Sequence, residues 1–170
     1  RSNIIDATSK LRDLRTDMER YFMDNRRYTT VAGGSVCGLD VAGGRIAAYN
    51  AILDRAAEGG VTFLDTADAY PVGGDLSTIG RTEEIIGRWL AARGRRDDVV
   101  IATKVGMQGG PDQPAGLTRD KIRAGIEASL SRLQTDHVDL FYAHIDDSET
   151  PLAETMAAFD ELVREGLVRV

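Results

Sequence analysis

Residues 59–70 read GGVTFLDTADAY, and this stretch decides which fold the sequence predicts. Glycines 59 and 60 end the helical pattern of residues 47–58, because glycine readily adopts the left-handed conformation that closes a helix. Residues 61–65 form a short, continuous apolar run, which is typical of a strand buried on both faces. A buried strand that follows a helix in this way favours an α/β fold with parallel pairing.

The same alternation repeats along the rest of the chain. We expect helices at residues 81–93, 118–133 and 152–165, and strands at residues 99–103, 138–143 and 167–170. Thr82 could cap the first of these helices, since threonine is a good N-cap residue. Helices that alternate with buried strands form either a doubly wound sheet or a (β/α)8 barrel. A complete barrel needs about 250 residues, so residues 41–170 would form about half of one.

Residues 1–40 follow a different pattern. Apolar side chains recur at steps of three and four between Ile4 and Tyr21, which predicts an amphipathic helix followed by a Gly-rich loop. Such a stripe can dock on its own domain or pack against copies of itself. We therefore divide the chain into a helical segment, residues 1–40, and an α/β domain, residues 41–170.

Composition narrows the classes of function. The 27 acidic and 21 basic side chains give a net charge of −6, which argues against nucleic-acid binding as the main role. Cys37 is the only cysteine, so neither an internal disulfide nor a cysteine-based zinc site is expected. No apolar run approaches the roughly 20 residues that cross a bilayer, and no signal peptide is visible. We expect no membrane-spanning segment.

Chemically active side chains follow each predicted strand. Asp65 and Tyr70 follow the first, Lys104 ends the second and His144 ends the third. Parallel α/β folds place their sites at the carboxyl ends of strands, so we expect these four residues to meet at one rim. We expect Asp68, Asp146 and Asp147 to line the rim or pair with arginines, and His137 to be exposed.

The motifs FLDTADAY (63–70), IATKVG (101–106) and DLFYAH (139–144) resemble the aldo-keto reductases, as does RTEEIIGRWL (81–90). The likeness runs from about residue 45 to residue 170. It implies a partial (β/α)8 TIM barrel with about strands 2–4, a cytoplasmic protein, and NADPH-dependent reduction of a small carbonyl substrate, an aldehyde or ketone. Carried over by motif, the catalytic tetrad of this family is Asp65, Tyr70, Lys104 and His144.

Physical roles follow for these four residues. Hydride transfer builds negative charge on the carbonyl oxygen, and a proton donor must meet that charge. We expect Tyr70 to be the general acid, with Lys104 favouring loss of the phenolic proton and Asp65 compensating the ammonium. His144 would orient the substrate oxygen or donate a hydrogen bond to it.

The family resemblance also limits what this chain does alone. Aldo-keto reductases bind their cofactor largely in the second half of the barrel, so we assign no cofactor-binding residue here. We expect the 170-residue chain by itself to bind NADPH weakly or not at all, and to be inactive.

Two alternative readings remain open. Residues 4–7, 14–16 and 18–28 resemble the second half of the long N-terminal helix of type IV pilins, which implies an extracellular pilus subunit that self-associates through this helix. Alternatively, Asp65, Asp68, His144 and Asp146 could bind a divalent metal in a barrel hydrolase. The positive charge of Lys104 would oppose a cation there, so we predict no metal site.

Overall fold

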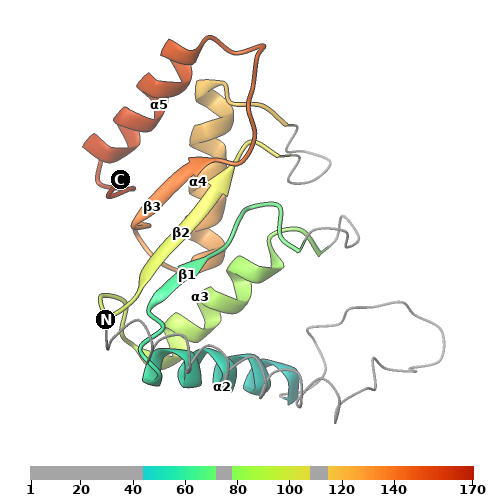
Figure 1. Ribbon diagram of the computed structural model, residues 1–170, viewed down its shortest axis with the longest axis vertical. Coiled ribbons are helices and arrows are strands. Elements are labelled where there is room, and N and C mark those ends of the chain that lie inside the picture. The colour runs from blue at the N-terminus through green and yellow to red at the C-terminus, as the bar shows by residue number, and fades with distance from the viewer. Residues whose placement is uncertain (1–43, 72–77, 108–114) are drawn as a thin grey trace, which may run out of the picture. The chain divides into compact units, whose positions relative to one another are not determined.

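A computed structural model describes residues 44–71, 78–107 and 115–170 (Figure 1). The predicted helix near residues 4–21, the pilin-like segments, Cys37 and the expected boundary at residue 40 lie outside this part. Of the described residues, none belongs to a helix that is long and apolar enough to span a membrane. The described residues fall into two units that divide after Val61, and each is treated separately below.

The first unit contains helix α2 (Gly44–Glu58), which begins three residues earlier than the apolar pattern predicts. The helix ends at the two glycines, as expected. Gly60 has a φ of 84°, and the amide of Val61 donates to the carbonyl of Ala56 at 2.9 Å. The positive φ at Gly60 is what allows the chain to turn out of the helix here.

The second unit alternates strands and helices, as predicted. Its elements are β1 (Phe63–Asp65), α3 (Arg81–Arg93), β2 (Val100–Val105), α4 (Arg119–Leu133), β3 (Leu140–Ala143) and α5 (Leu152–Arg164). The strands form one parallel sheet in the order β1-β2-β3. Of the expected strand at residues 167–170, the structure contains an isolated parallel bridge between Val138 and Val168. The predicted α/β class is therefore confirmed.

Helices pack on one face of this sheet. On β2, Thr103 donates to Glu83 of α3 at 2.6 Å, and Val105 packs against Gly125 of α4. On β3, the ring of Phe141 lies 5.5 Å from that of Phe159 in α5. Alternate residues of the strands point to the opposite face. Within this unit, helices α3, α4 and α5 leave that face uncovered, and Phe63 on it is 53% exposed.

The start of α3 differs from the prediction. Gly80 occupies the N-cap position and, having no side chain, makes no capping bond. The Thr82 hydroxyl instead lies 2.8 Å from the hydroxyl of Thr66, just after β1. The capping prediction was wrong because Thr82 lies inside the helix, where its hydroxyl forms a hydrogen bond with that of Thr66. Glu83 and Glu84 do lie in the first turn, where carboxylates suit the helix dipole.

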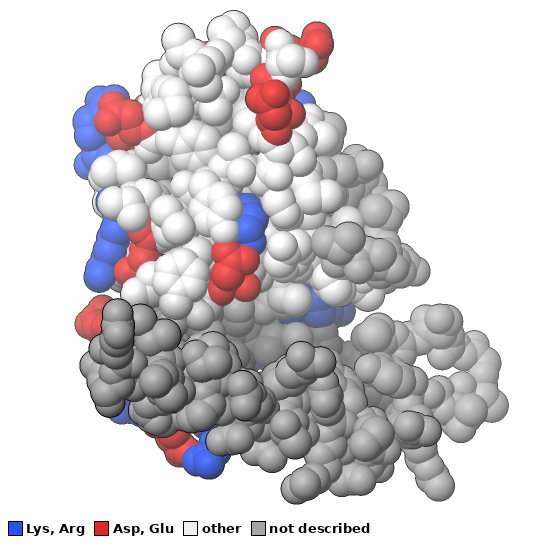
Figure 2. Space-filling model, viewed as in Figure 1, with Lys and Arg blue, Asp and Glu red and all other residues white. Residues whose placement is uncertain are grey.

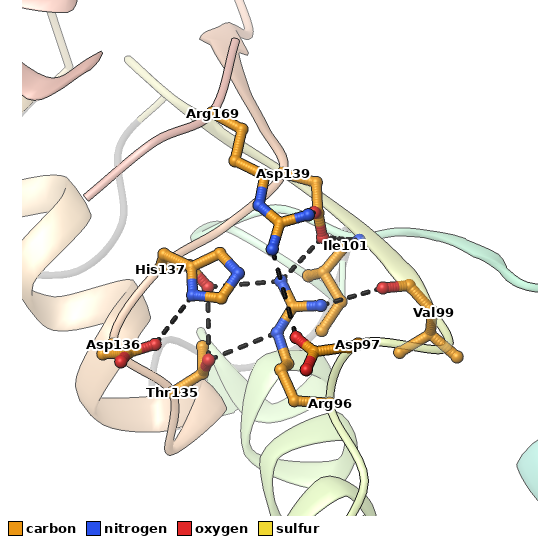
Figure 3. A network of polar contacts seen from close by, with 9 residues as sticks. All are labelled: Arg96, Asp97, Val99, Ile101, Thr135, Asp136, His137, Asp139 and Arg169. Atoms are coloured by element: carbon orange, nitrogen blue, oxygen red, sulfur yellow. Dashed lines mark hydrogen bonds and ion pairs between the residues drawn. The ribbon is translucent and has the colours of Figure 1, made fainter. Parts of the chain in front are cut away.

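A polar network joins the amino ends of β2 and β3 (Figure 3). Asp139 lies at its centre and accepts from Arg96 at 2.6 Å and from the amide of Ile101 at 2.8 Å, while Arg169 approaches it to 3.2 Å. The side chain of His137 is 17% exposed and contacts Asp136 at 2.7 Å, so the expectation of a solvent-exposed His137 was wrong. This network fixes the end of the sheet opposite to Lys104 and His144.

Candidate active site

Asp65, Lys104 and His144 come from three neighbouring strands of the sheet. Asp65 is the last residue of β1, Lys104 lies one residue before the end of β2, and His144 directly follows β3. Because the strands are parallel, these positions meet at one edge of the sheet. Tyr70 follows β1 by five residues, after a turn in which its amide donates to the carbonyl of Ala67.

An ion pair between Asp65 and Lys104 forms the centre of the site. Lys104 Nζ donates to Asp65 Oδ1 and, at 2.7 Å, to the carbonyl oxygen of Thr66. The Lys104 side chain is 9% exposed, whereas that of Asp65 is 43% exposed. Burial by itself would lower the pKa of Lys104, but the hydrogen bond and charge of Asp65 outweigh it and raise that pKa. The ammonium is therefore held in its charged form.

The pKa of Asp65 moves in the opposite direction. Partial burial would raise it, but hydrogen bonds from Lys104 and Tyr142 and the positive charge of Lys104 lower it below its ordinary value. Asp65 is therefore a carboxylate at neutral pH, and the pair is fully ionised.

The ring of Tyr70 lies near both the ammonium of Lys104 and the imidazole of His144. Its centroid is 4.9 Å from Lys104 Nζ, and 5.5 Å from the His144 ring at an interplanar angle of 73°. Burial and the nearby Lys104 lower the pKa of His144, which keeps its imidazole neutral at pH 7. Within the described residues, His144 Nδ1 is buried without a hydrogen-bond partner. The structure thus brings all four predicted residues together.

Tyr142 is a member of this cluster that the sequence analysis missed. It lies in β3 opposite Lys104, and its hydroxyl donates to Asp65 Oδ2. The centroid of its ring is 5.3 Å from Lys104 Nζ. The spacing in the sequence could have indicated this residue. Tyr142 precedes His144 by two residues, and side chains two residues apart along a strand point to the same face of the sheet.

Of the three aspartates expected to line the rim or pair with arginines, Asp146 is exposed, whereas Asp68 and Asp147 differ from the expectation. Asp68 is 1% exposed and thus does not line an open rim. Asp147 accepts from the amide of Leu117 and the hydroxyl of Thr150, each at 2.7 Å, and pairs with no arginine among the described residues. These bonds lower the pKa of Asp147 to about 2. Asp147 ties together two loops at this end of the sheet.

The geometry does not favour the metal-binding alternative. The described residues contain no group of three or more His, Cys, Asp or Glu side chains placed to hold a metal ion. Lys104 and Tyr142 already occupy both oxygens of Asp65. A metal ion at this carboxylate would lie next to the ammonium of Lys104, and the repulsion between two positive charges opposes its binding.

Positive charge available for phosphate groups is also scarce in the described part of the chain. From Arg55 onward, each described Lys and Arg side chain lies within 4.0 Å of a carboxylate, except Lys121, which donates to the carbonyl of Ala115. In the view of Figure 2, the surface over the sheet is mostly uncharged, with one acidic and one basic patch in contact near its centre. We therefore assign none of these cations to the phosphates of a dinucleotide.

Residues 46–170 match the model of the "Aldo/keto reductase family". The chain is 45% identical to the uncharacterized oxidoreductase YrpG of Bacillus subtilis over 123 residues, 69% of this chain and 37% of that protein. It is 36% identical to the aldo-keto reductase yakc [NADP(+)] of Schizosaccharomyces pombe, covering 72% of this chain and 35% of that protein.

A third relative has a different name. The chain is 39% identical to a probable voltage-gated potassium channel subunit beta of Arabidopsis thaliana, over 68% of this chain and 33% of that protein. The chain thus spans about a third of the length of these relatives. Identity at this level is shared by proteins with different named functions, so an activity has to be argued from the site residues.

Proposed function

Since the chain belongs to the aldo/keto reductase family, we propose that its α/β unit is part of a (β/α)8 barrel and contains the proton-transfer site of a carbonyl reductase. The proposed reaction reduces an aldehyde or ketone to an alcohol. One observation carries the proposal: Asp65, Lys104, Tyr70 and His144 converge at the carboxyl ends of three parallel strands, with the Tyr70 ring 4.9 Å from Lys104 Nζ.

The roles of the four residues follow from their surroundings. Tyr70 is the general acid that protonates the carbonyl oxygen, because it is a phenol whose ring lies 4.9 Å from Lys104 Nζ at the carboxyl ends of the strands. Asp65 holds Lys104 and balances its charge. His144, neutral at pH 7 because its pKa is lowered, donates a hydrogen bond to the same oxygen and orients the substrate.

The hydride donor implied by the family is NADPH, and a relative is named for NADP(+). A reduced nicotinamide supplies a hydride to the carbonyl carbon when bound. Because the described cations are all engaged, we assign no residue of this chain to that group. We accordingly propose that the 170-residue chain by itself does not turn over, and that the remaining barrel elements of a longer protein would supply the cofactor site.

An exchange of segments tests the chemistry. Residues 46–170 would replace the matching segment of YrpG, and the hybrid would be assayed for NADPH-dependent reduction of an aromatic aldehyde. We expect activity, and a loss of at least about 100-fold in kcat for Tyr70→Phe, the scale of general acid catalysis. Asp160→Asn, which removes an exposed carboxylate of α5, is the control. A hybrid that binds NADPH but is inactive, or one unaffected by Tyr70→Phe, would contradict the proposal.

A further inference from the structure

Two phenol rings flank the ammonium of Lys104. The centroid of the Tyr70 ring is 4.9 Å from Nζ and that of Tyr142 is 5.3 Å from it. Their hydroxyls differ in one respect: that of Tyr142 donates to Asp65, whereas that of Tyr70 makes no hydrogen bond to any of the residues that the structure describes. The family tetrad accounts for Tyr70 and leaves Tyr142 without a role.

The carboxylate of Asp65 is held from two sides. Lys104 of β2 occupies Oδ1 and Tyr142 of β3 occupies Oδ2, so Asp65 links all three strands. Its side chain is 43% exposed, and an exposed ion pair with a single contact gains little over water. A second donor on the other oxygen fixes the plane of the carboxylate and therefore the position of the ammonium.

We propose that Tyr142 is a positioning residue of the proton-transfer site: its hydroxyl locks Asp65 in the orientation that keeps Lys104 beside Tyr70. This inference rests on the proposed function for its catalytic meaning. The proposal also gives the two phenols different roles. Tyr142 is committed as a donor to Asp65, and Tyr70 remains the phenol that can give its proton to a substrate.

The electrostatics agree with this division. Burial and the hydrogen bond to Asp65 raise the pKa of Tyr142 above its ordinary value, and the opposing effect of Lys104 is smaller. Tyr142 therefore keeps its proton at neutral pH, where Asp65 is ionised. Without the Tyr142 hydroxyl, Asp65 would lose a hydrogen bond that stabilises its charged form, and the pKa of Asp65 would rise.

The test measures these protonation equilibria in the full chain by NMR, with labelled aspartate, lysine and tyrosine. Tyr142→Phe keeps the ring and removes the hydroxyl. We expect the pKa of Asp65 to rise by about one pH unit, the pKa of Lys104 to fall, and the ring signals of Tyr70 to shift. Asp160→Asn, at an exposed carboxylate of α5, should change none of these. In an Asp65→Asn background, Tyr142→Phe should have a smaller effect on Lys104, limited to the direct contact between Tyr142 and the ammonium.

A second variant covers the case in which Tyr142→Phe does not fold. In Asp65→Asn the pKa of Tyr142 should fall, because its anionic acceptor is gone. Unchanged titration of Asp65 and Lys104 in Tyr142→Phe, or an unchanged Tyr142 in Asp65→Asn, would overturn the inference. These measurements need no turnover. An inactive YrpG hybrid would therefore overturn the reductase proposal alone, while unchanged titrations would overturn the role of Tyr142 alone.

Discussion

Replacing Asp68 by asparagine should stabilise the fold, and more so at high pH. Asp68 is 1% exposed, and its Oδ1 atom is buried without a hydrogen-bond partner among the described residues. Burial and the nearby carboxylate of Glu83 raise its pKa from 3.8 to about 7, against a weaker opposing effect of Arg132. Arg132 cannot fully compensate because its Nε already donates to Glu83 at 2.6 Å.

The sign and the magnitude follow from linkage. The folded state binds the Asp68 proton more tightly than the unfolded state does, so this residue makes the fold less stable as pH rises from about 4 to about 7. A pKa raised from 3.8 to about 7 corresponds to at most about 4 kcal/mol. Asparagine has the same shape and no charge, so it removes this cost.

The measurement is urea unfolding followed by the fluorescence of Trp89, the only tryptophan, which is 1% exposed. Between about pH 4.5 and about pH 8, the stability of Asp68→Asn relative to the original chain should increase by about 2–3 kcal/mol. Asp160→Asn, an exposed carboxylate paired with Arg164 on α5, should show no such pH dependence. If Asp68→Asn weakens the fold equally at both pH values, the fold uses the ionised carboxylate and the reasoning is wrong.

Three further changes test other parts of the structure. Asp139→Ala should lower the free energy of unfolding in urea by about 3 kcal/mol, because it leaves Arg96 and the Ile101 amide without their acceptor (Figure 3). Arg169→Ala, at the exposed edge of the same network, should lower it by less than about 1 kcal/mol. Gly87→Ala should destabilise the fold by at least about 2 kcal/mol in thermal unfolding, since an added Cβ would lie 2.1 Å from the carbonyl oxygen of Arg132. Ala91→Gly on the exposed side of α3 is the comparison, because it changes only the helix propensity. NADPH fluorescence should show no saturable binding to the full chain at micromolar cofactor, because the described cations are paired; saturation in that range would contradict this.

The alternation of elements could be predicted because it depends on local patterns. Short apolar runs such as residues 61–65 and stops such as Gly59 and Gly60 leave few arrangements other than a parallel sheet with crossover helices. The predicted boundaries of the elements differ from the observed ones by a few residues, because fraying and tertiary contacts decide where a helix or strand ends. The capping role of Thr82 was mispredicted because Thr66, 16 residues earlier, takes its hydroxyl.

Part of the candidate site could likewise be predicted from the sequence, and part required the structure. Asp65, Lys104 and His144 could be identified from the sequence because parallel strands bring their carboxyl ends together, whatever the details of packing. Three features needed the folded chain: the burial of Asp68 beside Glu83, the use of Asp147 as a tie between loops, and the contact of Tyr142 with Asp65. Each depends on which side chains from distant elements meet.

By itself, the sequence determined the order of strands and helices, the edge of the sheet at which chemistry gathers and the family. Only the tertiary structure decided which atoms share a proton or a charge there, including which of the two phenols beside Lys104 is tied to Asp65. The physical reason is range. Periodicity and turn preferences act over a few residues, whereas hydrogen bonds and burial depend on distances of a few ångströms between residues as far apart as Asp65 and Tyr142.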